Sequence, residues 1–279
     1  PLTLLRVKMK LSIYTQIFPR LEIFFLDEWI EYHLRLGVDH IYIYDNGLKS
    51  TESPTEVDCK LESEFKQIKW AKKPDADYFL DYSDDEIYDH LHKLVKKYHT
   101  QVTLKLWRPK IECPYYERIF CQCKGYLNCI NENKRDQWWI HIDPDEYLFS
   151  ENVNLSDFID SYDTKNYFSL RLRQRVFEKR RRNFSVKSLS KYGYDIDIFK
   201  CIVKSPNINS QMDLTEKTTR NLFIHNVGST LGKSIDIPFD EFRINHYRGE
   251  PTSGSQHMKY VEGSGVLFDK VDRSMSRFL

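Results

Sequence analysis

The sequence predicts an α/β fold, and three segments near its start carry that prediction. Leu11–Phe18 and His40–Tyr44 are short apolar runs, and Glu22–Leu36 between them is amphipathic. Apolar runs of this length indicate buried strands, whereas a repeat of about 3.6 residues indicates a helix. The chain therefore begins with a β-α-β unit, whose two strands we expect to be parallel.

The connections of this unit agree with the assignment. Gly37 follows the helix where a left-handed cap is expected, and Asp45-Asn46-Gly47 ends the second strand with turn-forming residues. A helix at Glu56–Phe65 and a strand at Gln67–Ala71 would extend a Rossmann-like nucleotide-binding half. Ligands of such sheets bind at the carboxyl ends of the strands. The candidate contacts at those ends are Thr15, Gln16, Asp45 and Asn46.

The remaining elements are expected in the following order. Asp84–Tyr98 is predicted as a charged, solvent-facing helix, and Tyr115–Asn133 as a longer helix leading to a buried strand at Trp138–Ile142. Beyond Phe149 we expect shorter strands at Tyr167–Arg173, Ile198–Val203, Leu222–Val227 and Glu241–Tyr247. We expect one domain over residues 1–279 with a mixed central sheet, divided into a nucleotide-binding half (about 8–149) and a smaller half (about 150–279).

Composition excludes several kinds of partner. Lys and Arg number 42 against 41 Asp and Glu, so no net field would attract a nucleic acid. We interpret Lys179–Asn183 (KRRRN) as a solvated loop or a phosphate contact. The six cysteines show no disulfide or zinc spacing and are expected to be reduced. No stretch approaches the roughly 20 apolar residues that span a bilayer, and no signal-peptide pattern is present, so we expect a cytoplasmic protein. Nothing in the sequence indicates an oligomeric state.

An acidic motif follows the predicted strand at Trp138–Ile142. Three Asp-x-Asp triplets occur, at Asp75–Asp77, Asp143–Asp145 and Asp195–Asp197, but only the second directly follows a strongly apolar run and continues with Glu146. Neighbouring carboxylates at the end of a buried strand repel each other unless a cation neutralises them. Oxygen ligands suit Mn²⁺ or Mg²⁺. The alternative is a capped turn that uses Asp143 as an Asx residue.

Several short motifs follow one another along the chain: Glu28–His33, Leu36–His40, Tyr42–Asn46, Gln122–Cys129, Ile142–Tyr147, Lys200–Val203 with Pro206, Ile224–Asn226 and Ile244–Arg248. In this order they resemble the motifs of glycosyltransferase family 92. The resemblance spans about residues 11–263. It implies a GT-A fold and a metal-dependent, inverting transfer of a sugar, xylose or another pentose or hexose, from a UDP-sugar to a hydroxyl of a glycan or glycoprotein. The smaller half (about 150–279) would bind this acceptor.

The resemblance also implies roles for individual residues. Asp45 would accept from uracil or ribose, Asp145 would bind the metal, and Asp143 would touch the ribose or a metal-bound water. His246 would be a further metal ligand, with His225 as its competitor. Diphosphate and other donor contacts are expected from the side chains of Arg118, Gln122, Lys200 and Arg248.

The reaction needs one general base, which a carboxylate near the acceptor hydroxyl can supply. The candidates are Asp213, Glu178 and Asp197, with Asp75 and Asp77 also possible by position. Three alternatives stay open. A glycoside hydrolase also uses paired carboxylates, a non-catalytic carbohydrate-binding protein would use the aromatic side chains, and a metal-dependent phosphotransferase would use similar carboxylates but usually has a Gly-rich phosphate loop.

Overall fold

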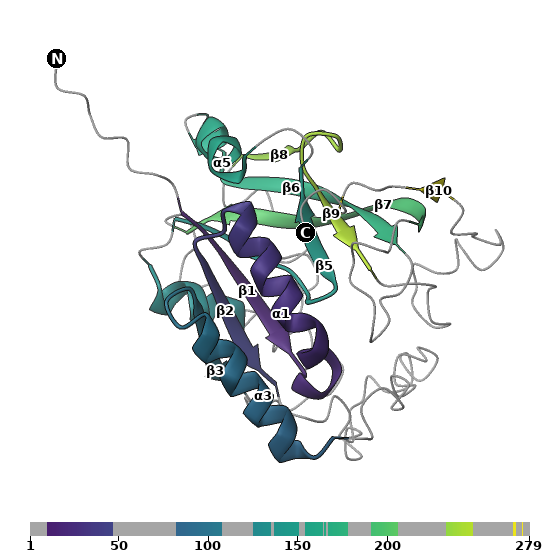
Figure 1. The fold of residues 1–279 in the computed structure, drawn as a ribbon. Coiled ribbons are helices and arrows are strands. Elements are labelled where there is room, and N and C mark those ends of the chain that lie inside the picture. The colour runs from purple at the N-terminus through teal and green to yellow at the C-terminus, as the bar shows by residue number, and fades with distance from the viewer. Residues whose placement is uncertain are drawn as a thin grey trace, which may run out of the picture.

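One mixed sheet forms the centre of the molecule (Figure 1). The structure, a computed structural model, describes residues 10–46, 82–107, 125–134, 137–150, 154–163, 165, 167–177, 191–205, 233–247, 270–271 and 275. Within these residues the sheet has ten strands, in the order β3-β2-β1-β4-β7-β6-β9-β5, with β8 paired to β6 and β10 to β7. The predicted α/β class with a mixed central sheet is confirmed.

The first unit is the β-α-β arrangement that the sequence predicts. It consists of β1 (Leu11–Ile17), α1 (Pro19–Leu36) and β2 (His40–Asp45), and β1 and β2 pair in parallel. The helix begins three residues earlier than expected because Pro19, whose ring fixes a helical φ, occupies its first turn. It ends at Gly37, whose φ of 108° confirms the left-handed cap.

The third parallel strand comes from a segment for which no strand was predicted. β3 (Val102–Leu106) pairs in parallel with β2. Its polar and apolar residues are mixed because it lies at the edge of the sheet, where Leu106 is 61% exposed. The helix expected at Glu56–Phe65 and the strand expected at Gln67–Ala71 lie outside the described residues.

A helix leads into β3. α3 (Asp84–Lys97) starts in a capping box, in which the Ser83 side chain accepts from the Glu86 N–H and the Glu86 carboxylate accepts from the Ser83 N–H. The prediction of this helix is confirmed, but the prediction that it faces only solvent is wrong. Ile87, Leu91 and Leu94, at helical spacing, are buried in the core that α1 also enters.

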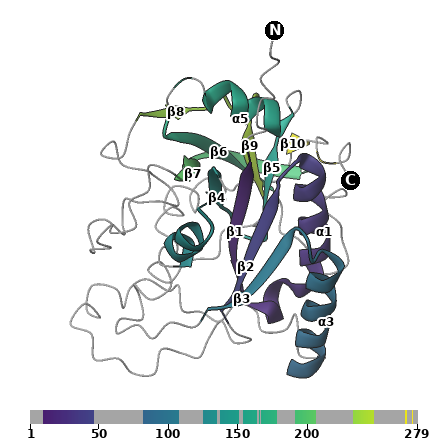
Figure 2. The same cartoon turned by 90° about the vertical axis from the view of Figure 1, so that its left-hand side faces the viewer.

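β4 (Trp138–His141) pairs in parallel with β1 on the side away from β2, so β3, β2, β1 and β4 form a parallel sheet. α1 and α3 cover one face, and the helical residues 125–132 cover the other (Figure 2). The side chains of β1 alternate accordingly. Ile13 and Ile17 belong to the core that includes α1, whereas Tyr14 belongs to the aromatic cluster with Tyr44 and Tyr126.

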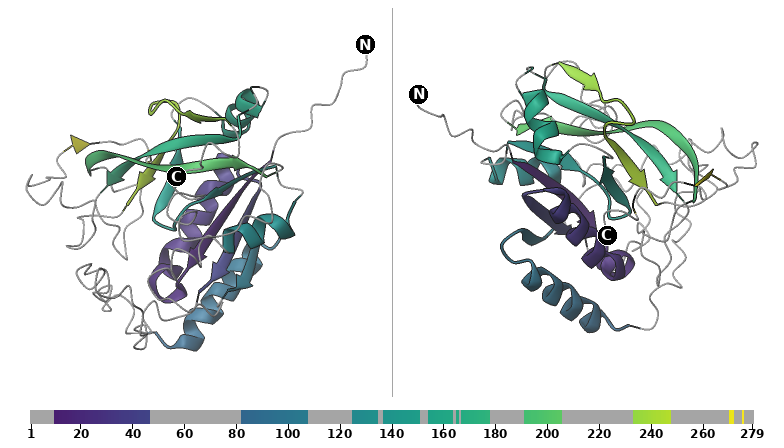
Figure 3. Two further views of the ribbon diagram at one scale, coloured as in Figure 1. Left: turned by 180° about the vertical axis from the view of Figure 1, so that it is seen from behind. Right: turned by 45° about the horizontal axis from the view of Figure 1, so that its top comes forward.

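The second part of the sheet is mostly antiparallel. β7 (Lys191–Lys204) pairs antiparallel with β4 and so joins the two parts. Figure 3 shows β7 and the long β6 side by side, with β9 beyond them. The elements here are β5 (Glu146–Phe149), α5 (Leu155–Asp163), β6 (Ser169–Phe177), β8 (Ser234–Asp236), β9 (Arg243–His246) and β10 (Lys270–Val271).

Several of these elements differ from the prediction. β5 and α5 were not predicted, and β6 and β7 are longer than the strands expected there. The strand expected at Leu222–Val227 lies outside the described residues. Cys129 and Cys201 are buried free thiols, as expected. No helix in the described part of the chain is both long and apolar enough to cross a bilayer.

Candidate functional site

The acidic motif lies at the point where the strand order of the parallel sheet reverses. From β1 the chain proceeds to β2 and β3 on one side, whereas β4 lies on the other side of β1. Sheets of this kind bind ligands in the crevice beyond the carboxyl ends of the two central strands. Asp143-Pro144-Asp145 follows the carboxyl end of β4 after a single residue, Ile142. The motif is therefore in the position where the topology favours a ligand.

The motif forms a tight turn between β4 and β5. The Glu146 N–H donates to the Asp143 carbonyl (2.9 Å), and the Asp143 N–H donates to the Glu146 carboxylate (2.8 Å). We call residues 143–146 the acidic turn. The alternative in which the Asp143 carboxylate caps the turn is not what the structure has, because Glu146 provides the cap and the Asp143 carboxylate contacts another strand.

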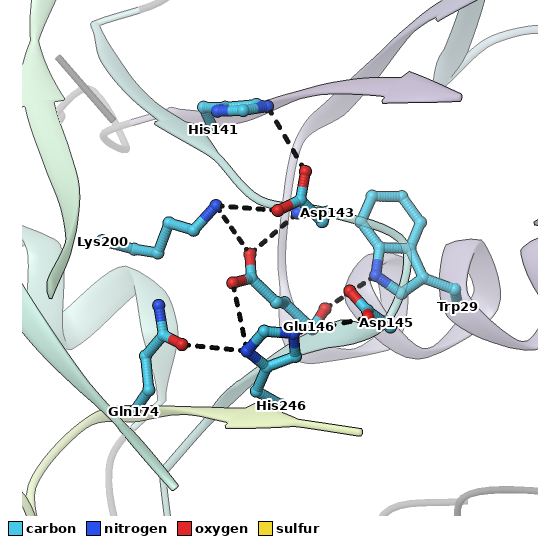
Figure 4. Close-up of polar contacts among 8 residues, drawn as sticks. All are labelled: Trp29, His141, Asp143, Asp145, Glu146, Gln174, Lys200 and His246. Atoms are coloured by element: carbon cyan, nitrogen blue, oxygen red, sulfur yellow. Dashed lines mark hydrogen bonds and ion pairs between the residues drawn. The ribbon is translucent and has the colours of Figure 1, made fainter. Parts of the chain in front are cut away.

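A buried lysine holds one end of the acidic turn (Figure 4). Lys200 Nζ in β7 lies 3.1 Å from Asp143 Oδ2 and 2.9 Å from Glu146 Oε2. The side chains of Lys200 and Glu146 are both 1% exposed. This three-residue contact was not predicted, since Lys200 was expected to meet the diphosphate and here meets two carboxylates instead.

Burial and charge act in opposite directions on these groups. Burial alone would raise the pKa of Asp143, but the charge of Lys200, with His141, holds that pKa well below its usual range. Burial raises the pKa of Glu146, and the Lys200 charge opposes this rise. Burial would lower the pKa of Lys200, but Asp143 and Glu146 hold it above its usual value. Lys200 thus stays charged and keeps Asp143 ionised.

The other end of the turn faces β9. His246 Nε2 lies 3.3 Å from Asp145 Oδ2, although the two residues are far apart in the sequence. On the other side of the ring, Nδ1 lies 3.0 Å from Gln174 Oε1 and 3.7 Å from Glu146 Oε1. Acceptor oxygens thus face both ring nitrogens, and with its proton on Nδ1 the ring would present the Nε2 lone pair to an ion shared with Asp145. The Asp145 side chain is 42% exposed, and His246 is 11% exposed.

These residues can be compared with what a divalent ion requires. Two neighbouring ligands of an octahedral ion, each about 2.1 Å from it, lie about 3.0 Å apart. The 3.3 Å between Asp145 Oδ2 and His246 Nε2 is close to that value. A carboxylate oxygen and an imidazole nitrogen also suit Mn²⁺. Within the described residues, however, no group of three or more His, Cys, Asp or Glu is arranged to hold a metal ion. Asp145 and His246 could thus fill two coordination positions of a divalent ion.

The four residues expected at the carboxyl ends of β1 and β2 lie there. Asp45 is 4% exposed and accepts a hydrogen bond from the Tyr88 hydroxyl (3.1 Å) of α3. The Asn46 N–H donates to the Ile17 carbonyl and extends the pairing of the two strands by one bond. Gln16 is 8% exposed. Thr15 is fully buried within the sheet.

Other candidates fall where the structure gives no side chain. Asp197 lies within β7, but its side chain is not described. The candidates outside the described residues are Asp75, Asp77, Arg118, Gln122, Glu178, Asp213, His225 and Arg248. Their predicted roles stay predictions.

The site also contains residues that were not singled out from the sequence. Gln174 is buried, and it shares one face of β6 with Leu170, Leu172 and Val176. Sequence reasoning could have found Gln174, because it is a polar residue at an apolar position of an alternating strand. His141, the last residue of β4, is 2% exposed and has its Nε2 atom 3.8 Å from Asp143 Oδ1. Trp29 is a further case, because its contact with Glu146 is visible only in three dimensions.

No protein-family model matches the chain, and no curated protein sequence matches it. Among solved structures, it is similar to UDP-glucose pyrophosphorylase from Acinetobacter baumanii over 92% of both chains, at 9% identity and a TM-score of 0.36. It is also similar to a UDP-glucose pyrophosphorylase complexed with UDP-glucose, over 73% of this chain and 71% of the other, at 11% identity and a TM-score of 0.26. These similarities of fold are distant and carry no argument about function.

Proposed function

We propose that this chain is a metal-dependent glycosyltransferase that moves a sugar from a UDP-sugar to a glycan hydroxyl, with inversion at the anomeric carbon. The observation that carries the proposal is the meeting of Asp145 and His246 at the reversal point of the sheet. A carboxylate and an imidazole, both common metal ligands, come together there from two distant segments of the chain. They lie at the edge where an α/β sheet binds nucleotides. The resemblance to glycosyltransferase family 92 supplies the reaction class and the uridine nucleotide.

The proposal assigns the two ends of the acidic turn to different tasks. Asp145 and His246 would hold Mn²⁺ or Mg²⁺, with oxygens of the donor diphosphate filling further positions. When bound, such a cation offsets the charge that develops on the UDP leaving group. Asp143, kept ionised by Lys200, would accept a hydrogen bond from the ribose or from a metal-bound water. Asp45, at the end of β2, would accept from the uracil or the ribose.

The chemical step would need a base on the acceptor side. A carboxylate within hydrogen-bond reach of the acceptor hydroxyl would take its proton as the oxygen attacks the anomeric carbon, and the bond from that carbon to UDP would break. Asp213, Glu178 and Asp197 are the proposed candidates. This base typically contributes a factor of about 10² to 10⁴ in rate.

A donor screen tests the proposal. The protein is incubated with UDP-xylose, UDP-galactose, UDP-glucose and their N-acetylated counterparts in Mn²⁺, with and without EDTA, and UDP release is followed. We expect UDP release with one donor, its loss in EDTA, and a reduction of at least about a hundredfold in the Asp145→Asn variant. UDP release without added pyrophosphate distinguishes sugar transfer from nucleotidyl transfer, because nucleotidyl transfer from a UDP-sugar would consume pyrophosphate and give UTP and a sugar 1-phosphate.

The screen also separates the alternatives. Sugar release from a glycan without any nucleotide would support a glycoside hydrolase, which needs paired carboxylates but no nucleotide site. No metal-dependent response to any UDP-sugar, in turnover or in thermal unfolding, would contradict the proposed transferase.

A further inference from the structure

Side chains of α1 bind the edge of β5 that faces away from β9, where β5 is the strand that follows the acidic turn. Within the described residues β5 pairs with one strand, β9. On its other side the Trp29 indole N–H donates to the Glu146 carbonyl (2.8 Å), the Tyr32 hydroxyl donates to the Leu148 carbonyl (2.5 Å), and the Leu148 N–H donates to His33 Nε2 (3.2 Å). Buried backbone groups need such partners, so helix side chains replace a neighbouring strand here.

We call Trp29, Tyr32 and His33 the α1 clamp. Their spacing of three and four residues places them on one face of the helix. All three are at most 1% exposed. The His33 ring lies 4.5 Å from the Trp29 ring, 5.1 Å from the Tyr32 ring and 5.6 Å from the Tyr147 ring, measured between centroids. The clamp is thus packed on several sides and has little freedom to move independently of β5.

The hydrogen bonds of His33 define its tautomer. Its Nδ1 atom lies 2.8 Å from the Trp29 carbonyl, and its Nε2 atom faces the Leu148 N–H. A carbonyl can only accept and an N–H can only donate, so Nδ1 carries the proton and Nε2 carries a lone pair. Burial also lowers the pKa of His33 to about 3, against the opposing effect of the Trp29 carbonyl. The ring is therefore neutral and suited to accept from β5.

The clamp connects to the candidate site through β5. Glu146, whose carbonyl accepts from Trp29, is the first residue of β5 and lies opposite His246 in β9 (Figure 4). The Tyr247 N–H donates to the Asp145 carbonyl (2.8 Å). The backbone that carries Asp145 and the backbone that carries His246 are therefore fixed to each other through a strand whose second edge is held by α1.

We propose that Trp29 and His33 are positioning residues for the Asp145–His246 pair. By holding the edge of β5, they keep the Asp145 carboxylate and the His246 ring at a spacing that suits one divalent ion. This role rests on the proposed function of the pair. Neither side chain touches the ion or the substrate.

The test uses His33→Leu, which removes both hydrogen bonds, and His33→Gln, whose amide oxygen can accept from the Leu148 N–H. Leu91→Ala serves as the control, because Leu91 is fully buried in α3 and its loss destabilises the core without touching β5. Trp29→Phe, which keeps a ring but loses the N–H, replaces His33→Leu if that variant does not fold.

The first readout is amide hydrogen exchange in the metal-free protein. We expect His33→Leu to speed exchange at Leu148 and Tyr247 at least about tenfold relative to Ile43 in the distant strand β2. His33→Gln should restore most of the protection. Equal acceleration at all three amides, or the same selective pattern in Leu91→Ala, would overturn the proposal.

The second readout is Mn²⁺ affinity in the presence of UDP, measured by electron paramagnetic resonance. We expect His33→Leu to weaken binding about tenfold and His33→Gln to recover it. Unchanged affinity in both His33→Leu and Trp29→Phe would overturn the positioning role. A wild-type protein that binds no Mn²⁺ with UDP would contradict the proposed function instead, and the exchange pattern alone would then decide whether the clamp positions the pair.

Discussion

The two ends of the acidic turn differ in how their charge is balanced. The Asp143 side chain, 37% exposed, lies against the buried ammonium of Lys200, whereas the Asp145 side chain, 42% exposed, faces the His246 ring at 3.3 Å. A cation built into the protein thus offsets the first carboxylate permanently. The second carboxylate faces an imidazole nitrogen, and this combination suits an ion from solution. On the proposed function, one motif would therefore provide both a fixed support and an exchangeable metal site.

The largest expected effect on stability comes from removing the lysine at the Asp143 end of the acidic turn. Lys200→Met would leave Asp143 and Glu146 without their buried cation, and breaking a buried pair in this way costs about 3–5 kcal/mol. Lys93→Met is the matched control, because Lys93 pairs with Asp89 on the surface. Exposed pairs of this kind contribute at most about 1 kcal/mol. Urea unfolding of both variants measures the difference, and an equal cost for the two would remove the contrast between the ends.

The pH dependence of stability has a defined sign. The pKa of His33 is about 3 in the folded protein and 6.5 in the unfolded chain, so the unfolded chain binds the extra proton first. The contribution of His33 is fully present above pH 6.5 and is lost as the pH falls toward 3, by up to about 1.4 kcal/mol per pH unit.

Asp143 responds in a lower range. Its folded pKa lies below the ordinary 3.8, so its contribution is present above 3.8 and is lost only as the pH falls through the lowered value. Acid should therefore lower the free energy of unfolding first through His33, which the unfolded chain protonates below pH 6.5, and only at lower pH through Asp143. Urea unfolding between pH 7 and pH 4 measures the His33 contribution alone, and in the control His33→Gln the dependence of the unfolding free energy on pH should fall by the equivalent of about one proton. An unchanged slope in that variant would contradict the neutral, buried His33.

The parts of the molecule that could be predicted depend on local signals. The β1-α1-β2 unit is predictable because its apolar spacing, its Gly37 cap and its turn residues all lie within one short stretch. The same holds for the acidic turn, which follows a strongly apolar strand. β3 was missed because an edge strand with an exposed face carries mixed residues. α5 was missed although Leu155, Phe158, Ile159 and Tyr162 have helical spacing.

The rest depends on contacts between distant segments. β5 has only four residues and owes its place to side chains of α1 more than a hundred positions earlier, so no local pattern indicates it. Lys200 was predicted as a site residue because of its charge, but its partners are set by the antiparallel pairing of β7 with β4. Gln174 could have been noticed as a polar residue on the apolar face of β6, but its contact with His246 depends on the pairing of β6 with β9.

The most direct measurement is a titration with Mn²⁺ in the presence of UDP, followed by electron paramagnetic resonance, for the wild-type protein, Asp145→Asn and Asp143→Asn. The account predicts one ion per wild-type chain, a loss of affinity of at least about tenfold in Asp145→Asn, and a smaller loss in Asp143→Asn. Wild-type affinity in Asp145→Asn would contradict the assignment of the metal to the Asp145 end of the acidic turn.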